Sequence, residues 1–213
     1  MIASQIKQLT ESLPKDVTLV AVSKTKPNSA IEEAYGVGHR DFGENKVQEL
    51  CQKAEELPKD IRWHMIGHLQ RNKVKYIAPF VHLIHGVDSE RLLAEINKQG
   101  VKNNRVIDVL IQLHIAEESS KFGFSYEEAE ALFSKENLYP NVRIVGLMGM
   151  ATFTEDQTQI AREFETLSTF YNSWKTQKYL SVLSMGMSND YPIAIASGST
   201  MIRIGSHIFG KRD

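Results

Sequence analysis

The sequence contains a single cysteine, Cys51, among its 213 residues, so no internal disulfide can form. Cys51 falls on the apolar stripe of a helix expected from about residue 45 to 56, which predicts a buried structural thiol rather than a nucleophile. No apolar run is long enough to cross a membrane. Residues 1–13 carry apolar side chains at helical spacing instead of the continuous apolar core of a signal peptide, and we expect a cytoplasmic protein.

The sequence also lacks an excess of charge of one sign. Its 25 lysines and arginines nearly balance its 26 aspartates and glutamates, which gives a net charge of -1. Nucleic-acid binding is therefore disfavoured, whereas a small anionic ligand remains possible. Low-complexity stretches, flexible linkers and internal repeats are missing as well, so we expect one domain over residues 1–213.

Several common catalytic patterns are missing. The sequence contains no GxSxG, GxxxxGK[ST] or GxGxxG motif, which removes the usual support for hydrolase, P-loop and Rossmann functions. His64 and His68 are four residues apart, but Gly67 and a strand-like context argue against a shared helical face, and we predict no metal site. His82, His85 and His114 alternate with apolar residues and are interpreted as satisfied interior groups.

The sequence does have an alternation of strand and helix patterns with short connections. This alternation predicts a closed (β/α)8 barrel, with a doubly wound open sheet as the alternative. The expected strands cover residues 17–22, 39–44, 62–67, 81–87, 106–115, 143–150, 180–186 and 200–205. The sequence ends a few residues after the eighth strand, so we expect the N-terminal helix to cover the place of the missing eighth helix.

Polar residues near helix starts predict where the helices begin. The expected N-caps are Asn28 or Ser29, Asp88 or Ser89, Ser125 in a capping box with Glu128, Thr154 in a capping box with Gln157, and Ser188. Gly100 is expected just after the end of its helix, where glycine is favoured.

The first strand pattern, VTLVAV, is followed by two lysines, Lys24 and Lys26. The carboxyl end of a buried strand is where α/β sheets carry ligands, and a partly desolvated lysine there can form a Schiff base with an aldehyde. Lys24 is therefore the candidate Schiff-base residue. The alternative is that both lysines are solvated loop residues before Pro27.

Two segments rich in glycine and serine, SMGMS (184–188) and SGST (197–200), are typical of phosphate sites. Barrels often hold phosphate in the loops around the last two strands, although SGST precedes the eighth strand and fits that rule less well. The alternative for each segment is an ordinary capped turn. The candidates are Ser184, Ser188, Gly198, Ser199 and Thr200, with Gly205 and Ser206 sharing this role.

Arg203 lies between Ile202 and Ile204, so its side chain should point opposite to theirs. If the isoleucines pack against helices, the guanidinium enters the barrel mouth; the alternative is an ion pair at the periphery. Three other residues, Asn45, His64 and Met148, belong to the same expected ring around the mouth. A lysine, a phosphate cup and an arginine that can face a ring nitrogen together describe a site for pyridoxal 5′-phosphate (PLP).

The motifs AVSKTKP, FGENKVQE, WHMIGHLQRNK, KFGF, GLMGM, SMGMSND and GSTMIRIGSHIFG occur in this order over residues 17–210. With them the sequence resembles the PLP homeostasis protein family (YggS/PROSC-type). The resemblance implies a fold-type III barrel, similar to the barrel domain of alanine racemase, with no second domain. It also implies Lys24 as the Schiff-base residue, Arg203 beside the pyridine nitrogen and Asn45 near the ring. Around the phosphate it implies Ser184, Ser188, Gly198, Ser199 and Thr200. Gly86, where serine is common, and Pro192 depart from the family pattern.

The resemblance implies a non-catalytic carrier or buffer of PLP that regulates vitamin B6 and amino-acid pools. The alternative is a small PLP-dependent racemase, which needs a base on each face of the reacting carbon. A barrel that binds a sugar phosphate without a Schiff base is a third possibility. Expected partners are PLP and apo PLP-dependent enzymes, with no nucleic acid and no membrane, and the expected state is a monomer or weak dimer. Lys121, after the fifth strand, is expected to capture the cofactor transiently.

Overall fold

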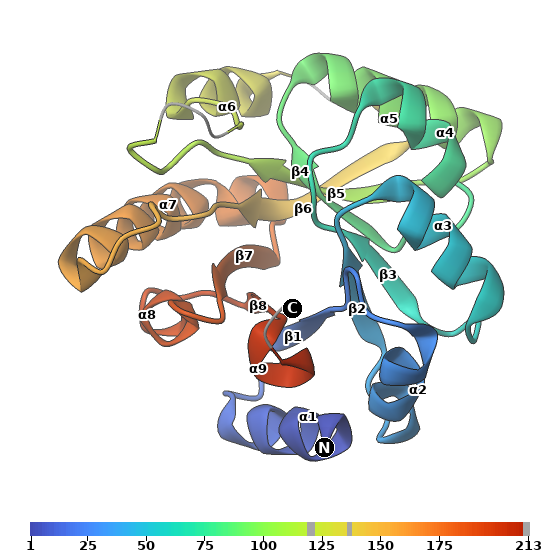
Figure 1. The fold of residues 1–213 in the computed structure, drawn as a ribbon. Helices are drawn as coiled ribbons and strands as arrows, with labels where there is room; N and C mark the ends of the chain where they lie inside the picture. The colour runs from blue at the N-terminus through green and yellow to red at the C-terminus, as the bar shows by residue number, and fades with distance from the viewer. Residues whose placement is uncertain (119–121, 136–137, 211–213) are drawn as a thin grey trace.

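A computed structural model describes residues 1–118, 122–135 and 138–210 and shows a closed barrel of parallel strands in chain order (Figure 1). The strands are β1 (Thr18–Val22), β2 (Asp41–Glu44), β3 (Arg62–Met65), β4 (Leu83–Val87), β5 (Ile107–Gln112), β6 (Val142–Met148), β7 (Val182–Met187) and β8 (Met201–Ile204). Because β1 pairs in parallel with both β2 and β8, the predicted barrel is confirmed and the open-sheet alternative is wrong.

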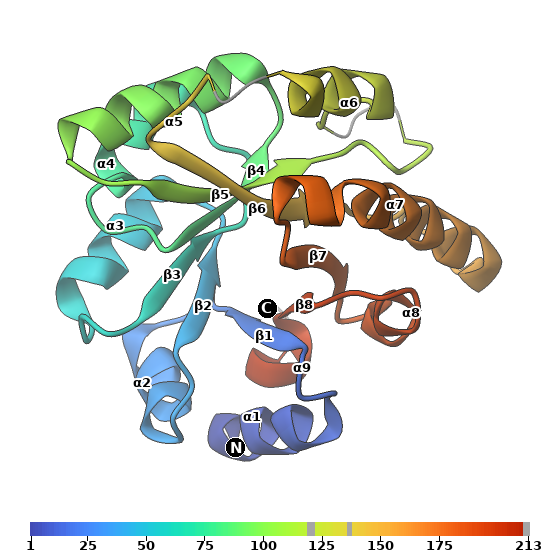
Figure 2. The ribbon, with the colours of Figure 1, turned by 180° about the vertical axis from the view of Figure 1, so that it is seen from behind.

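Helices surround the barrel on the outside (Figures 1 and 2). They are α1 (Ile2–Ser12), α2 (Asn28–Gly36), α3 (Val47–Glu56), α4 (Val74–Ile77), α5 (Glu90–Lys102), α6 (Tyr126–Ser134), α7 (Gln157–Lys178), α8 (Tyr191–Ala196) and α9 (Ser206–Phe209), with a 3₁₀ turn η1 (Arg71–Lys73) before α4. Among the helices of the described residues, none combines the length and the apolar character needed to cross a membrane.

The alternation of side chains along the strands creates two apolar regions. In β1, Leu19 and Ala21 belong to the core between barrel and helices, whereas Val20 faces the barrel interior. The interior apolar cluster consists of Val20, Leu83, Leu110, Met148 and Met201. The interior is therefore apolar on one side, and the polar side chains described below occupy the rest of it.

The helix starts follow the expected residues in two cases. Ser89 accepts a hydrogen bond from Leu92 N at the start of α5, and Ser125 forms the predicted capping box with Glu128 at the start of α6. The other expectations are wrong by one or two residues: the N-caps are Pro27 for α2, Asp156 for α7 and Asp190 for α8.

Each difference has a local cause. The Asp156 carboxylate accepts from two backbone N–H groups of α7, whereas Thr154 lies two residues earlier and accepts from Asp156 N. Ser188 is followed by a turn in which Asp190 accepts from Met187 N. Gly100 lies inside α5, where a Cβ atom would stand 2.8 Å from the carbonyl oxygen of Asn141, so close packing requires glycine there.

The first helix, α1, lies where it was predicted, over the place of the missing eighth helix. α1 packs beside α2 and α9, next to the join of β1 and β8 (Figure 2), and its Ile6 is 3% exposed. After β8 the structure has only the four-residue helix α9 before the described residues end. The chain therefore supplies most of the cover on this side of the barrel from its N-terminal end.

The closest approach of two strands provides a stability prediction. A Cβ atom at Gly146 in β6 would lie 1.8 Å from the carbonyl oxygen of Val182 in β7. We expect Gly146→Ala to lower the free energy of unfolding by about 3 kcal/mol or more in urea titrations, because the two backbones must separate. Gly36→Ala is the control: its Cβ meets nothing within 4 Å, so no loss is expected. Equal effects of the two substitutions would contradict this account.

Candidate functional site

The mouth of the barrel, at the carboxyl ends of the strands, holds a cavity of about 660 Å³. Its lining comes from the segments that follow β1, β2, β3, β6, β7 and β8. It includes Lys24, Lys26, Asn45, Ile66, Met150, Thr152, Phe153, Met187, Ser188, Asn189, Asp190, Arg203, Gly205 and Ser206. A cavity of this size suits a small cofactor, and its lining combines apolar side chains with a few polar groups.

Lys24 reaches this cavity because its backbone is held on both sides. Ser23, before it, is fully buried, and its carbonyl oxygen accepts from Lys53 Nζ at 2.8 Å. Thr25, after it, adopts the left-handed conformation with φ at 65°, which is costly for a β-branched residue. The Thr25 N–H donates to Glu49 Oε1 at 2.5 Å. The turn that carries Lys24 is therefore fixed by side chains of α3.

Lys53 is the centre of a buried group of charges behind this turn. Its Nζ lies 2.7 Å from both Glu44 Oε1 and Glu49 Oε1, and the side chains of Lys53 and Glu44 are 6% and 0% exposed. Glu44 also accepts from the Ser23 hydroxyl at 2.6 Å. Burial raises the pKa of Glu44, and the hydrogen bonds from Lys53 and Ser23 oppose that rise. The Ser23 carbonyl oxygen, Glu44 Oε1 and Glu49 Oε1 together use all three N–H donors of Lys53.

Arg203 enters the barrel mouth as its position between two isoleucines predicts. Ile202 and Ile204 belong to the outer core, and Arg203 is 4% exposed. Its Nη1 donates to Ser184 Oγ at 2.6 Å and its Nη2 donates to the Gly149 carbonyl oxygen at 3.2 Å. Burial lowers the pKa of Arg203 to about 10, so the guanidinium is still cationic at neutral pH.

The serine hydroxyl groups of the mouth come from the turns after β7 and β8. Ser188 follows β7, and Ser206 follows Gly205 at the start of α9. Gly186 adopts φ of 99°, and a Cβ atom there would lie 2.7 Å from the Ala194 Cβ, so only glycine lets β7 turn this closely past α8. These turns place hydroxyl and backbone donors beside Arg203, which is a suitable environment for an anionic group.

Six of the candidate residues thus meet at the mouth: Lys24, Asn45, Ser188, Arg203, Gly205 and Ser206. Asn45 is positioned by a close contact behind it, since a Cβ atom at Gly67 would lie 2.5 Å from the Asn45 carbonyl oxygen.

The SGST segment lies at the opposite end of the barrel, and its assignment to a phosphate site is wrong. Thr18 N, at the start of β1, donates to the Thr200 carbonyl oxygen, which places the segment at the amino ends of the strands. The hydroxyls of Ser199 and Thr200 bond to the backbone of Met185 and Leu183. The reason is that α8 carries the chain back from the mouth before β8 begins, so Gly198 is distant from the mouth as well.

Ser184, His64 and Met148 face the barrel interior below the mouth rather than the cavity. Ser184 is fully buried, and its hydroxyl is engaged by His85 and Arg203. Met148 is 1% exposed and packs in the interior apolar cluster. We therefore leave these three residues out of the cofactor-contacting set, because alternation along a strand gives the face of a side chain but not its depth in the barrel.

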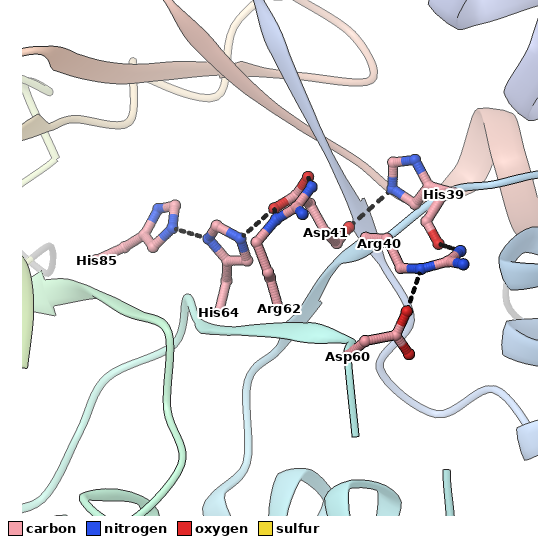
Figure 3. A network of polar contacts seen from close by, with 7 residues as sticks. All are labelled: His39, Arg40, Asp41, Asp60, Arg62, His64 and His85. Carbon is pink, nitrogen blue, oxygen red and sulfur yellow. Dashed lines mark hydrogen bonds and ion pairs between the residues drawn. The ribbon is translucent and has the colours of Figure 1, made fainter. Parts of the chain in front are cut away.

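A chain of hydrogen bonds crosses the interior (Figure 3). Arg62 binds the Asp41 carboxylate with two donors at 2.7 and 2.5 Å. Asp41 Oδ1 lies 3.0 Å from His64 Nε2, and His64 Nδ1 lies 2.9 Å from His85 Nε2. His85 Nδ1 is 3.1 Å from Ser184 Oγ, which in turn contacts Arg203. The expectation of a satisfied interior group is confirmed for His85, whereas His82 is exposed and His114 is only partly buried. His64 is a satisfied interior group as well.

The base of this chain is the one described place where potential metal ligands gather. One ligand atom each of Asp41, His64 and His82 lies within 4.8 Å of the others. Both oxygens of Asp41 are already bound by the Arg62 guanidinium, a cation that opposes a second positive charge at this point. We therefore assign no metal to this group.

Some lining residues were not identified from the sequence. Asp190 and the residues from Thr152 to Thr154 line the cavity at loop positions to which no recognisable motif assigned a site role. Lys53, which holds the turn behind Lys24, was not identified because its helix, α3, is rich in polar residues. Cys51 is only partly buried, with its Sγ 3.6 Å from the Tyr76 carbonyl oxygen. Lys121 lies outside the described residues.

Comparisons with known proteins agree with this geometry. A family model described as alanine racemase, N-terminal domain, matches residues 1–213. The chain is 40% identical over 197 residues to the pyridoxal phosphate homeostasis protein of Aquifex aeolicus, an alignment that covers 91% of this chain and 86% of that protein.

Solved structures show the same barrel. PipY from Synechococcus elongatus PCC7942, with PLP bound, matches with a TM-score of 0.90 at 35% identity and covers 99% of this chain and 100% of its own. An alanine racemase from Bartonella henselae with covalently bound pyridoxal phosphate shares the fold, with a TM-score of 0.76 at 14% identity over 99% of this chain and 60% of that one.

The buried charges behind Lys24 generate a second prediction. Lys53→Met leaves Glu44 buried without its cation, so we expect the free energy of unfolding to fall by about 3 to 5 kcal/mol in urea titrations. The control is Lys98→Met on the exposed face of α5, which should change stability little. Adding Glu44→Leu to Lys53→Met should recover part of the loss. A loss as small as that of the control would show that the buried ion group does not hold the turn.

Proposed function

This chain belongs to the family of pyridoxal phosphate homeostasis proteins, and we propose that it binds PLP reversibly at the mouth of its barrel. The observation that carries the proposal is the convergence of Lys24, Arg203 and two hydroxyl-bearing turns on one cavity. When bound, PLP supplies an aldehyde, a pyridine nitrogen and a phosphate group. Each of these three groups has a matching partner among the lining residues.

Lys24 is the attachment point in this proposal. Its amine follows β1 at the cavity edge, and the bonds of Lys53 to Ser23 and of Glu49 to Thr25 limit the movement of its backbone. A fixed backbone lowers the entropy that the lysine loses when it is attached to a ligand. Lys26 lines the same cavity and is the competing amine.

Arg203 faces the ring nitrogen in this proposal. A guanidinium can only donate hydrogen bonds, so it leaves a pyridine nitrogen in the accepting, unprotonated state. An unprotonated ring withdraws electrons less strongly, which weakens the electron sink that many PLP reactions need. The phosphate is held by the turns after β7 and β8, through Ser188, Gly205 and Ser206.

The same features support a carrier rather than an enzyme. Racemisation needs a second base opposite the lysine, and the described lining contains no tyrosine, histidine or cysteine that would serve. The racemase alternative is supported by the fold that the chain shares with alanine racemase, and Lys26 or Asp190 of the lining would have to act as its second base. We further infer that apo PLP-dependent enzymes receive the cofactor and that the chain is a monomer or weak dimer.

Replacement of the lysine tests the attachment point. We expect Lys24→Ala to abolish the visible absorption band of PLP-loaded protein and the cofactor label that borohydride fixes, as mapped by peptide mass spectrometry. Lys46→Ala is the control, because Lys46 is exposed nearby at the start of α3 and does not line the cavity. Lys26→Ala should keep the label on Lys24.

Two results would contradict this part of the proposal. A label at full stoichiometry on the Lys24→Ala protein would show that another amine is the attachment point. Conversion of L-alanine to D-alanine by the loaded parent, but not by the Lys24→Ala protein, would favour the racemase over the carrier.

The phosphate turns generate a fourth prediction. Charge-assisted hydrogen bonds contribute about 1.5 to 3 kcal/mol each, so pyridoxal should bind at least about tenfold more weakly than PLP in equilibrium titrations. Ser188→Ala should weaken PLP binding and leave pyridoxal binding nearly unchanged. Ser199→Ala, at the other end of the barrel, is the control. Equal affinities for pyridoxal and PLP would exclude a phosphate site at the mouth.

A further inference from the structure

The geometry points to a coupling between the two ends of the barrel, in which Asp41, His64 and His85 are positioning residues that set how Ser184 holds Arg203. This inference rests on the proposed function only for its cofactor readout. It follows from the hydrogen-bond chain that runs from Asp41, at the amino end of β2, through His64 and His85 (Figure 3), and from there to Ser184 and Arg203.

The acceptor at the base fixes the direction of the chain. Burial alone would raise the pKa of Asp41, but its bonds from Arg62 and His64 outweigh burial and hold that pKa well below its ordinary value. An ionised carboxylate only accepts, so the hydrogen in the Asp41 contact belongs to His64 Nε2. An imidazole that donates from Nε2 can accept at Nδ1, and His64 Nδ1 lies 2.9 Å from His85 Nε2.

The same logic continues toward the mouth. His85 donates from Nε2 to His64 Nδ1, and burial holds the pKa of His85 well below its ordinary value. The neutral ring of His85 therefore accepts at Nδ1, and the Ser184 hydroxyl donates to it. Every donor in the chain points toward Asp41.

This direction decides what Ser184 offers to Arg203. With its hydrogen turned to His85, Ser184 Oγ presents lone pairs to Arg203 Nη1 at 2.6 Å. The second bond, to the Gly149 carbonyl oxygen, completes the fixation of a guanidinium that is 4% exposed. If the chain were reversed, His85 Nδ1–H would donate to Ser184 Oγ beside Arg203 Nη1, and the Ser184 hydroxyl hydrogen would lose His85 as its acceptor.

Asp41→Asn should reverse the direction of this chain of hydrogen bonds. In the parent, Arg62 Nε and His64 Nε2 share Asp41 Oδ1, and Arg62 Nη2 binds Oδ2. When the single amide oxygen of the Asp41→Asn side chain keeps the bond from Arg62 Nη2, its NH₂ group takes the Oδ1 position and faces His64 Nε2. His64 must move its hydrogen to Nδ1 to accept from that group, and His85 must follow in the same direction. The change is made at the far end of the barrel from the cofactor.

The chain offers a matched control for this substitution. Asp108 of β5 binds Arg143 of β6 with two contacts at 2.7 and 2.8 Å, just as Asp41 binds Arg62. In both cases the aspartate and the arginine are directly paired on neighbouring strands. Asp108 differs because, within the described residues, its carboxylate is hydrogen-bonded to Arg143 and to no histidine. Loss of a cross-strand ion pair is therefore common to both substitutions, and reversal belongs to Asp41 alone.

The first experiment compares PLP affinity in Asp41→Asn and Asp108→Asn proteins. We expect Asp41→Asn to weaken PLP binding by about tenfold, the scale of one hydrogen bond at a charged donor, with an altered visible absorption spectrum. Asp108→Asn should keep the parent affinity and spectrum, although both proteins lose thermal stability. Equal affinities in the two variants would overturn the coupling.

The Ser184→Ala protein keeps the test valid if Asp41→Asn fails to fold. Removal of the hydroxyl deletes the last link, so Ser184→Ala should weaken PLP binding by a similar factor. Where the double variant folds, adding Asp41→Asn to Ser184→Ala should cause no further loss. An additional loss equal to that of Asp41→Asn alone would show that the effect does not pass through Ser184.

A measurement without cofactor separates this inference from the proposed function. Nitrogen-15 chemical shifts of the unloaded parent should show hydrogen on Nε2 of both His64 and His85, and on Nδ1 of both in Asp41→Asn. Hydrogen on His85 Nδ1 in the parent would overturn the inference. A parent that fails to bind PLP but shows the expected tautomers would instead contradict the proposed function.

Discussion

A closed barrel leaves its inward-facing polar side chains with few partners besides one another and the nearby backbone. The interior of this protein contains an aspartate, two histidines, a serine and an arginine, and each is satisfied by the next. An unpaired polar group at this depth would cost about 1 to 3 kcal/mol. The position of Arg203 at the mouth is thus tied to residues that never approach the cavity.

The turn after β1 is likewise held in place by buried polar side chains. Lys24 needs an exact backbone position, yet Thr25 beside it adopts a conformation that β-branched residues avoid. The cost is offset by α3, whose Lys53 and Glu49 hold the backbone on both sides of Lys24. Buried ions that contribute little net stability can in this way serve to place a neighbouring residue.

Much of the fold and part of the site could be predicted from the sequence. Alternation of patterns gave the barrel, and the position of Arg203 between two isoleucines gave its inward direction. The SGST segment was misplaced because composition does not tell which end of a barrel a loop occupies, whereas strand direction does. Ser184 was misplaced because alternation does not give depth. The Asp41–Arg62 pair depends on the register of β2 and β3, which local patterns do not contain.

The pairing of β1 with β8 has a consequence for how the chain is made. Thr18 lies beside Met201, so one edge of the first strand has no partner until almost the whole chain has left the ribosome. An unpaired edge is a template for wrong association, and contacts between distant parts of a chain form slowly. α1 packs beside α9 at this same join, so its contacts with α9 can form only after α9 has been synthesised. Closure of the barrel therefore depends on two segments that are distant in the chain, and a nascent chain halted before β8 would expose the strand that carries Lys24 at its end.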